Sequence, residues 1–244
     1  MARSNALYEL LGKYQVLKNQ NPKKNVECEL ESMYEFVQRC NAVEGSSLTL
    51  DEVKDVISGG VNNVTDNNKE ELEAAGLYDA LLYVKRLVEE GIPLSEEVVK
   101  ELHRITFVGS SVDFKGVYRT DFVTIPHARN MPPVRHISYF MNKLFDEYKE
   151  MAYLDILKKV ALFHIKFENI HPFSDGNGQV GRLIVAYQLL KAGYPFMCID
   201  PKDKKPYVKA IEKYNEELDD SAMVDIFTQA LKDELKKRIK YLSK

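Results

Sequence analysis

Apolar residues recur at three- and four-residue spacing through most of this chain, with charged residues between them. That spacing places the apolar side chains on one face of an α-helix, whereas the alternation typical of half-buried strands is scarce. Segments rich in Asn, Gly, Ser and Pro separate the periodic stretches. The pattern predicts helices over residues 5–17, 26–41, 49–57, 70–90, 95–107, 136–148, 154–169, 178–192, 204–216 and 221–242.

The helical pattern is interrupted between positions 109 and 133. Residues 114–119 and 122–125 are short β-prone pieces, and several prolines follow them. Two such pieces beside turn residues predict a small exposed β-hairpin. We therefore expect an all-α fold with one hairpin, divided into an N-terminal helical region (1–68) and a main domain (69–244).

Composition narrows the class of protein. The chain has 244 residues, of which 45% are hydrophobic and 29% charged, which is the balance of a globular protein. A net charge of −3 supplies no field that would hold a polyanion, so no nucleic-acid partner is expected. The three cysteines have no metal-binding spacing, and no apolar run is long enough for a membrane span. We expect a soluble, cytoplasmic protein with reduced thiols and no membrane contact.

One segment, His171 to Arg182, has the residue types of a phosphate site, with three of the twelve glycines of the chain. Pro172 should end the preceding helix near Ile170 and leave His171 extended on a loop. The loop from Asp175 feeds the next helix, whose N-terminus suits a phosphate, while a carboxylate suits Mg²⁺. A base, a metal ligand, an anion site and a cation thus fall within one segment, although an ordinary glycine-rich turn would share much of this composition.

The same segment, His-Pro-Phe-Ser-Asp-Gly-Asn-Gly-Gln-Val-Gly-Arg, closely resembles the Fic-domain signature HPFx(D/E)GN(G/K)RxxR and departs from it at one fixed position. The preceding helix, residues 161–170, is also typical of that family. The resemblance implies a Fic-type helical bundle and the transfer of AMP from ATP to a Ser, Thr or Tyr hydroxyl of a target protein, that is, a protein adenylyltransferase.

The resemblance also implies roles for individual residues. His171 would be the general base for the target hydroxyl. Asp175 would hold Mg²⁺ between the α- and β-phosphates. The backbone of Gly176 to Gly178 and the Asn177 side chain would bind the α-phosphate, and Arg182 the β- or γ-phosphate. A His164, Glu168 and His171 zinc site is disfavoured because the spacing is not His-Glu-x-x-His.

Three further positions are assigned to the nucleotide pocket. Gln179 stands where the family usually has arginine, so one positive charge on the triphosphate is missing and nucleotide binding is weaker or altered. Tyr207 and Tyr214 share a helical face; they cover the pocket or pack in the core.

The N-terminal segment Asn41-Ala42-Val43-Glu44-Gly45 is similar to the inhibitory motif (S/T)xxxE(G/N) of Fic proteins that carry it before the core. In that reading Glu44 pairs with Arg182 and displaces the terminal phosphate from its productive position. Cys40 replaces the usual Ser or Thr, and we expect inhibition to persist without that hydroxyl. A plain helix end with a C-terminal glycine is the alternative.

Residues 114–133 are similar to the flap of the family, on which a target docks by adding a strand. The flap residues assigned to docking are Val123, Thr124 and Ile125. Self-modification and homodimer formation are left open.

Two other functions stay open at this point. The missing charge at Gln179 is compatible with a nucleotide-binding regulator that has little catalysis. A Fic enzyme could also use another nucleotide donor or remove AMP, with Glu44 positioning a water molecule; Doc-type phosphate transfer is disfavoured because Gly178 stands where those toxins have lysine.

Overall fold

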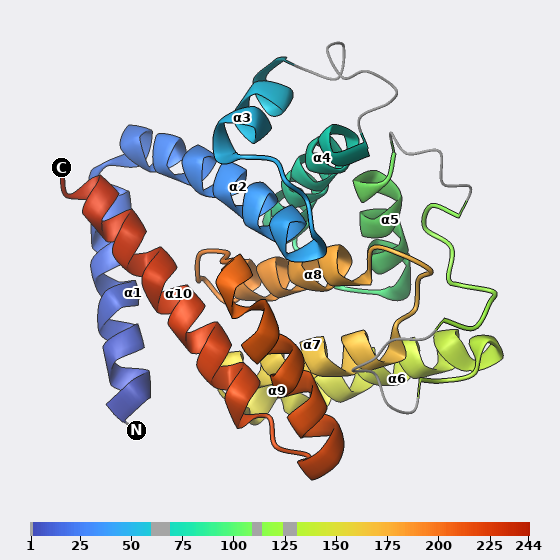
Figure 1. The fold of residues 1–244 in the computed structure, drawn as a ribbon. Coiled ribbons are helices and arrows are strands. Elements are labelled where there is room, and N and C mark those ends of the chain that lie inside the picture. Colours follow the sequence, from blue (N-terminus) through green and yellow to red (C-terminus); the bar gives the residue numbers. More distant parts are fainter. Residues whose placement is uncertain (1, 60–68, 109–113, 124–130) are drawn as a thin grey trace.

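The computed structural model describes residues 2–59, 69–108, 114–123 and 131–244, and every regular element in these ranges is helical (Figure 1). The all-α prediction is confirmed. The α-helices are α1 (Ala2–Gln20), α2 (Pro22–Glu44), α3 (Leu50–Gly59), α4 (Lys69–Glu89), α5 (Glu96–Thr106), α6 (Ile137–Glu150), α7 (Ile156–Ile170), α8 (Asn177–Lys191), α9 (Lys204–Glu217) and α10 (Ser221–Leu242). Short 3₁₀ helices cover Val134–His136, Met151–Tyr153 and Pro201–Asp203.

Helix α8 lies in the centre of the molecule, with α2 and α4 on one side and α7 on the other (Figure 1). Apolar residues occur around most of its circumference, which is typical of a helix that is buried on all sides. Leu183 and Ile184 belong to a core with α2, α4, α5 and α6, whereas Val185 and Leu189 belong to a second core with α1, α7, α9 and α10. Both cores therefore hold α8 in place.

The end of α2 is fixed by its backbone. Gly45 has φ +109°, and its N–H donates to the Ala42 carbonyl at 3.1 Å. The N–H of Ser46 donates to the Asn41 carbonyl at 3.0 Å, which completes a Schellman ending. Glu44 is therefore the last helical residue, held in a defined place above α8 rather than on a loop.

The predicted β-hairpin is wrong for the described part of residues 114–133, which contains no strand. Phe114 to Gly116 form a turn, and the irregular piece after it pairs with the loop after α7: the Arg119 N–H donates to the Pro172 carbonyl at 2.9 Å. The β-prone residues thus follow a loop and have no partner strand in that part. Val123 lies in irregular structure, and Thr124 and Ile125 lie outside the described residues.

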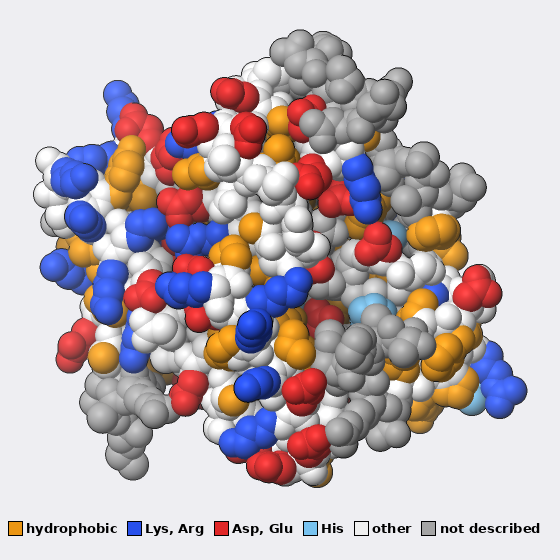
Figure 2. All heavy atoms as spheres, in the orientation of Figure 1, with side chains coloured by type: hydrophobic (Ala, Val, Ile, Leu, Met, Phe, Trp, Pro, Cys, Tyr) orange, Lys and Arg blue, Asp and Glu red, His pale blue; other side chains and the backbone are white. Residues whose placement is uncertain are grey.

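Acidic and basic side chains are interspersed over the face seen in Figure 2, as expected for a chain with a net charge near zero. No described helix combines the length and the apolar character that crossing a bilayer requires.

Candidate active site

Helix α7 ends at Ile170, as the position of Pro172 predicted. His171 itself has φ +49°, in the left-handed region, so the predicted extended conformation is wrong; its N–H still donates to the Phe167 carbonyl at 3.0 Å. A non-glycine residue in this region is unfavourable unless its surroundings hold it. Arg119 does so, because its Nε donates to the His171 carbonyl at 2.8 Å.

The Asn177 side chain closes the loop that follows. Its Oδ1 accepts from the Phe173 N–H at 2.9 Å, and its Nδ2 donates to the Phe173 carbonyl at 2.8 Å. The Asn177 amide is buried, and both its oxygen and its nitrogen are hydrogen-bonded within the loop. Asn177 therefore holds the loop in shape, and the backbone N–H groups of the first turn of α8 are the groups available to a ligand.

Buried His103 supports the loop from below. Its Nδ1 accepts from the Gly116 N–H at 2.9 Å, so its Nε2 is the nitrogen that donates to the Asp175 carbonyl, at 3.1 Å. Its ring stacks on Phe173 with 4.0 Å between centroids. Burial lowers the pKa of His103 to about 4, which keeps the ring neutral and the hydrogen-bond pattern intact. The sequence alone did not connect this helix with the motif.

The Asp175 carboxylate is exposed at the mouth of the loop, and its Oδ1 accepts from the Gly176 N–H at 2.8 Å. Gly176 has φ +78°, and a Cβ there would lie 2.2 Å from the Phe107 ring, so the turn requires glycine. Mg²⁺ commonly binds one or two carboxylates together with phosphate oxygens and water. An accessible carboxylate beside a phosphate-sized site fits that requirement.

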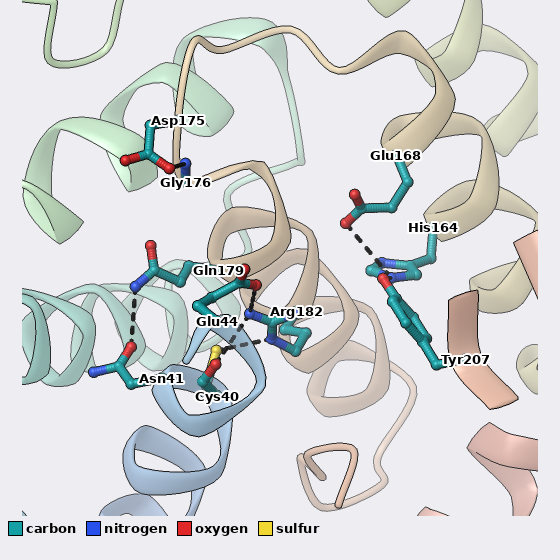
Figure 3. Close-up of polar contacts among 10 residues, drawn as sticks. All are labelled: Cys40, Asn41, Glu44, His164, Glu168, Asp175, Gly176, Gln179, Arg182 and Tyr207. Carbon is teal, nitrogen blue, oxygen red and sulfur yellow. Dashed lines mark hydrogen bonds and ion pairs between the residues drawn. The ribbon is translucent and has the colours of Figure 1, made fainter. Parts of the chain in front are cut away.

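Arg182 is almost completely buried and faces the end of α2 (Figure 3). Its Nε donates to the Cys40 sulfur at 2.9 Å, one terminal nitrogen donates to the Cys40 carbonyl at 3.2 Å, and the same nitrogen forms an ion pair with the Glu44 carboxylate. Burial alone would raise the pKa of Glu44, but the Arg182 guanidinium holds it below its usual value. The Cys40 thiol thus occupies the place expected for a hydroxyl and contacts the arginine directly.

The Glu44 carboxylate also lies against the first turn of α8. A Cβ on Gly178 would be 2.2 Å from Glu44 Oε1 and 3.0 Å from an Arg182 nitrogen. The first turn of α8 contains no acidic residue of its own. Unpaired N–H groups and the helix dipole favour an anion at such an end, so Glu44 occupies a position where a phosphate would also be stabilised.

Gln179 lies outside this arrangement. Its side chain is buried, and its Nε2 donates to Asn41 Oδ1 at 3.0 Å, which links α8 to α2 (Figure 3). Gln179 thus makes a second contact between α8 and α2, beside that of Arg182.

A cavity of about 310 Å³ brings most of the predicted residues together. Its lining includes His171, Asp175, Gly176, Asn177, Gly178, Arg182, Tyr207 and Glu44, but neither Gln179 nor Tyr214. Tyr214 packs at the edge of the second core, which is the alternative considered for it. Sequence reasoning did not find Lys204, which lines the cavity from the first turn of α9; its three-residue spacing from Tyr207 was the available signal.

Two residues that line the cavity, Glu168 and Tyr207, form a buried group with His164 (Figure 3). The Tyr207 hydroxyl lies 2.6 Å from His164 Nε2, and Glu168 Oε1 lies 3.8 Å from the same nitrogen. Burial lowers the pKa of His164 to about 3 and raises that of Glu168 to about 7. The imidazole is therefore neutral where it meets the tyrosine hydroxyl, and Glu168 changes its charge near neutral pH.

Residues 93–189 match the model of the Fic/DOC family. The chain is 26% identical over 189 residues to a protein adenylyltransferase Fic of Nematostella vectensis, covering 76% of this chain and 44% of that protein. It is 24% identical over 189 residues to the protein of the same name from Drosophila melanogaster, covering 76% and 38%. The chain thus spans less than half the length of these relatives.

Solved structures agree with this result. A Fic-domain-containing signaling protein of Bacteroides thetaiotaomicron superposes with a TM-score of 0.85 at 25% identity, covering 98% of this chain and 97% of that one. Fic-1 of C. elegans superposes with a TM-score of 0.80 at 20% identity, covering 98% and 74%, which shows similarity of fold.

Proposed function

From the premise that this chain contains a Fic/DOC family domain, we propose that it is a protein adenylyltransferase that moves AMP from ATP to a hydroxyl of a target protein. The observation that carries this proposal is the single cavity that holds His171, Asp175, the first turn of α8 and Arg182. A Mg²⁺ requirement, the protein target and a cytoplasmic location are parts of the same proposal.

The reaction needs four contributions from the chain. The His171 imidazole takes the proton of the target hydroxyl, whose oxygen attacks the α-phosphorus while pyrophosphate leaves. The N–H groups of Gly176 to Gly178 stabilise the charge on the α-phosphate oxygens. Asp175 would hold Mg²⁺, which supplies positive charge to the leaving phosphates. Arg182 binds the β- or γ-phosphate.

We further propose that Glu44 inhibits this activity, with residues 1–68 as the inhibitory region and 69–244 as the catalytic domain. The ion pair between Glu44 and Arg182 supports this inhibition, because the carboxylate pairs with the guanidinium that a terminal phosphate would otherwise bind. The hydrogen bond from Gln179 to Asn41 adds a second link to the same helix turn.

The test is intact-mass spectrometry of the full chain with Mg²⁺ and each of the four nucleoside triphosphates. Glu44→Gly should acquire an AMP adduct, or transfer one to a supplied target, faster than the wild type, and the Glu44→Gly/His171→Ala double variant should not. If no nucleotide leaves an adduct on the Glu44→Gly protein or on any protein in an extract, the transferase proposal fails.

Removal of AMP is a second candidate because the Glu44 carboxylate lines the same cavity as His171 and could orient a water molecule there. A target that already carries AMP distinguishes the two directions. Release of free AMP by the wild type, and loss of that release in Glu44→Gln, would favour removal over transfer.

A further inference from the structure

A second cavity, of about 340 Å³, lies where α6, α7 and the C-terminal end of α8 meet the loop before α5. Its lining includes Leu94, Tyr148, Lys159, Tyr187, Gln188 and Lys191. It shares no lining residue with the cavity at His171. It is therefore a separate site at the opposite end of α8.

Three lysines line this cavity; Lys149 is paired with Asp146, whereas Lys159 and Lys191 are paired with no carboxylate within the described ranges. Lys159 Nζ lies 3.8 Å from the centroid of the Tyr148 ring, and Lys191 Nζ donates to the Tyr187 hydroxyl at 3.1 Å. No Asp or Glu is among the residues that line the cavity. Burial, and to a smaller extent the neighbouring Lys191, lower the pKa of Lys159.

Other lysines on the same helices are neutralised. Lys158 lies 3.4 Å from Asp220, Lys166 lies 2.6 Å from Glu147, and Lys149 lies 2.9 Å from Asp146. The C-terminal end of α8 explains Lys191, since a cation is favourable there. It does not explain Lys159, which stands near the N-terminus of α7, where an anion is favoured.

Gln188 provides an independent observation. Its side chain is 1% exposed, and neither its amide nitrogen nor its amide oxygen has a hydrogen-bond partner. Buried amides are nearly always paired, because leaving one unpaired costs the desolvation of both atoms. Gln188 lines the cavity, so a ligand that offers an acceptor and a donor would satisfy this amide once the side chain turns toward it.

We propose that this cavity binds a small organic anion, a phosphomonoester or carboxylate attached to a flat ring with a hydrogen-bonding edge. Lys159 and Lys191 bind the anionic group, Gln188 pairs with the ring edge, and Leu94, Tyr148 and Tyr187 supply apolar contact. The proposal does not depend on the reaction at His171.

Pyridoxal 5′-phosphate is a suitable probe, because it combines a flat ring, a phosphate and an aldehyde. The aldehyde condenses with an unprotonated lysine amine to an imine with loss of water, and borohydride reduces the imine to a stable secondary amine. Peptide mapping of the full chain then locates the label. Lys159 should be labelled several times faster than Lys158, its paired neighbour, because more of it is unprotonated.

Protection by AMP tests whether the labelled lysine belongs to a binding site. AMP should slow the labelling of Lys159 in a saturable way and leave Lys158 unaffected. Gln188→Leu should raise the AMP concentration needed for half protection by about tenfold, the loss expected for one hydrogen-bonding group. Lys191→Gln should raise it as well, and thermal unfolding checks that both variants remain folded.

Three results would overturn the proposal. The first is labelling of Lys159 no faster than that of Lys158, and the second is labelling that AMP does not slow at any concentration. The third is equal protection by inorganic phosphate, or unchanged protection in Gln188→Leu, because the ring would then contribute nothing.

Discussion

Replacing Glu44 with glutamine should make the proposed AMP transfer faster and the folded protein less stable. The change keeps the shape of the side chain and removes the charge that pairs with Arg182. A charge-assisted hydrogen bond contributes about 1.5–3 kcal/mol, which corresponds to roughly 10- to 150-fold in an equilibrium. Because the Glu44 side chain is 42% exposed, solvent screens the pair, and we expect the lower end, about tenfold.

The stability should fall by about 1 kcal/mol, since Arg182 keeps its two contacts with Cys40. The assay is the initial rate of AMP incorporation from labelled ATP, with chemical denaturation measured in parallel. Glu31→Gln is the matched control: Glu31 lies on the same helix, is 44% exposed and pairs with Lys54 at 2.6 Å, far from the cavity. It should lose a similar small stability without a change in rate.

The result that would refute the reasoning is a Glu44→Gln rate equal to or below that of the wild type, with ATP bound normally. The ion pair between Glu44 and Arg182 would then be only structural, and competition between Glu44 and the nucleotide for Arg182 would not limit the rate of transfer. A rate increase in Glu31→Gln as large as that in Glu44→Gln would point to general loosening of α2.

Three other predictions concern the same site. Gly178→Ala should lower the free energy of unfolding by about 1 kcal/mol, because the added Cβ displaces the Glu44 carboxylate. In a Glu44→Gly background the same change should instead raise the free energy of unfolding by up to about 1 kcal/mol, because alanine has the higher helix propensity. Chemical denaturation of the single and double variants measures both effects. The pKa of Glu168 is raised to about 7, so folding favours the neutral form of this side chain. The stability of the wild type relative to Glu168→Gln should therefore fall by about 3 kcal/mol as the pH rises from about 4.5 to 7, and then level off. Parallel stability curves for the two proteins across this range would contradict the prediction. Asp175→Asn should raise the Mg²⁺ concentration needed for half-maximal AMP incorporation, and an unchanged Mg²⁺ titration would remove Asp175 as the ligand.

Local patterns were sufficient for the helices and for the segment 171–182 that lines the cavity. Helical periodicity located α4 to α10, and Pro172 fixed the end of α7, because both depend on residues close in sequence. The hairpin prediction failed because β-propensity is a local preference for an extended backbone and does not determine which segment a residue pairs with. Arg119 pairs with the His171–Pro172 loop rather than with a second strand.

Long-range contacts account for the rest. Gln179 was expected to face the nucleotide, but its partner is Asn41, 138 residues away, and no pattern within the motif encodes that distance. The left-handed conformation of His171 likewise depends on the guanidinium of Arg119, 52 residues earlier. Contacts between residues that are far apart in the chain thus could not be predicted from a single sequence. The pairing of Glu44 with Arg182 is the exception, because the family resemblance implied it.

The position of α8 between two cores has a kinetic consequence. A helix held on all sides cannot move without disrupting both cores, so access to Arg182 must come from the last turn of α2. Such opening is a local unfolding event, with times from microseconds to seconds. If this step precedes nucleotide binding, the observed rate of ATP binding will reach a plateau at high ATP concentration, and the height of that plateau is the opening rate of the turn.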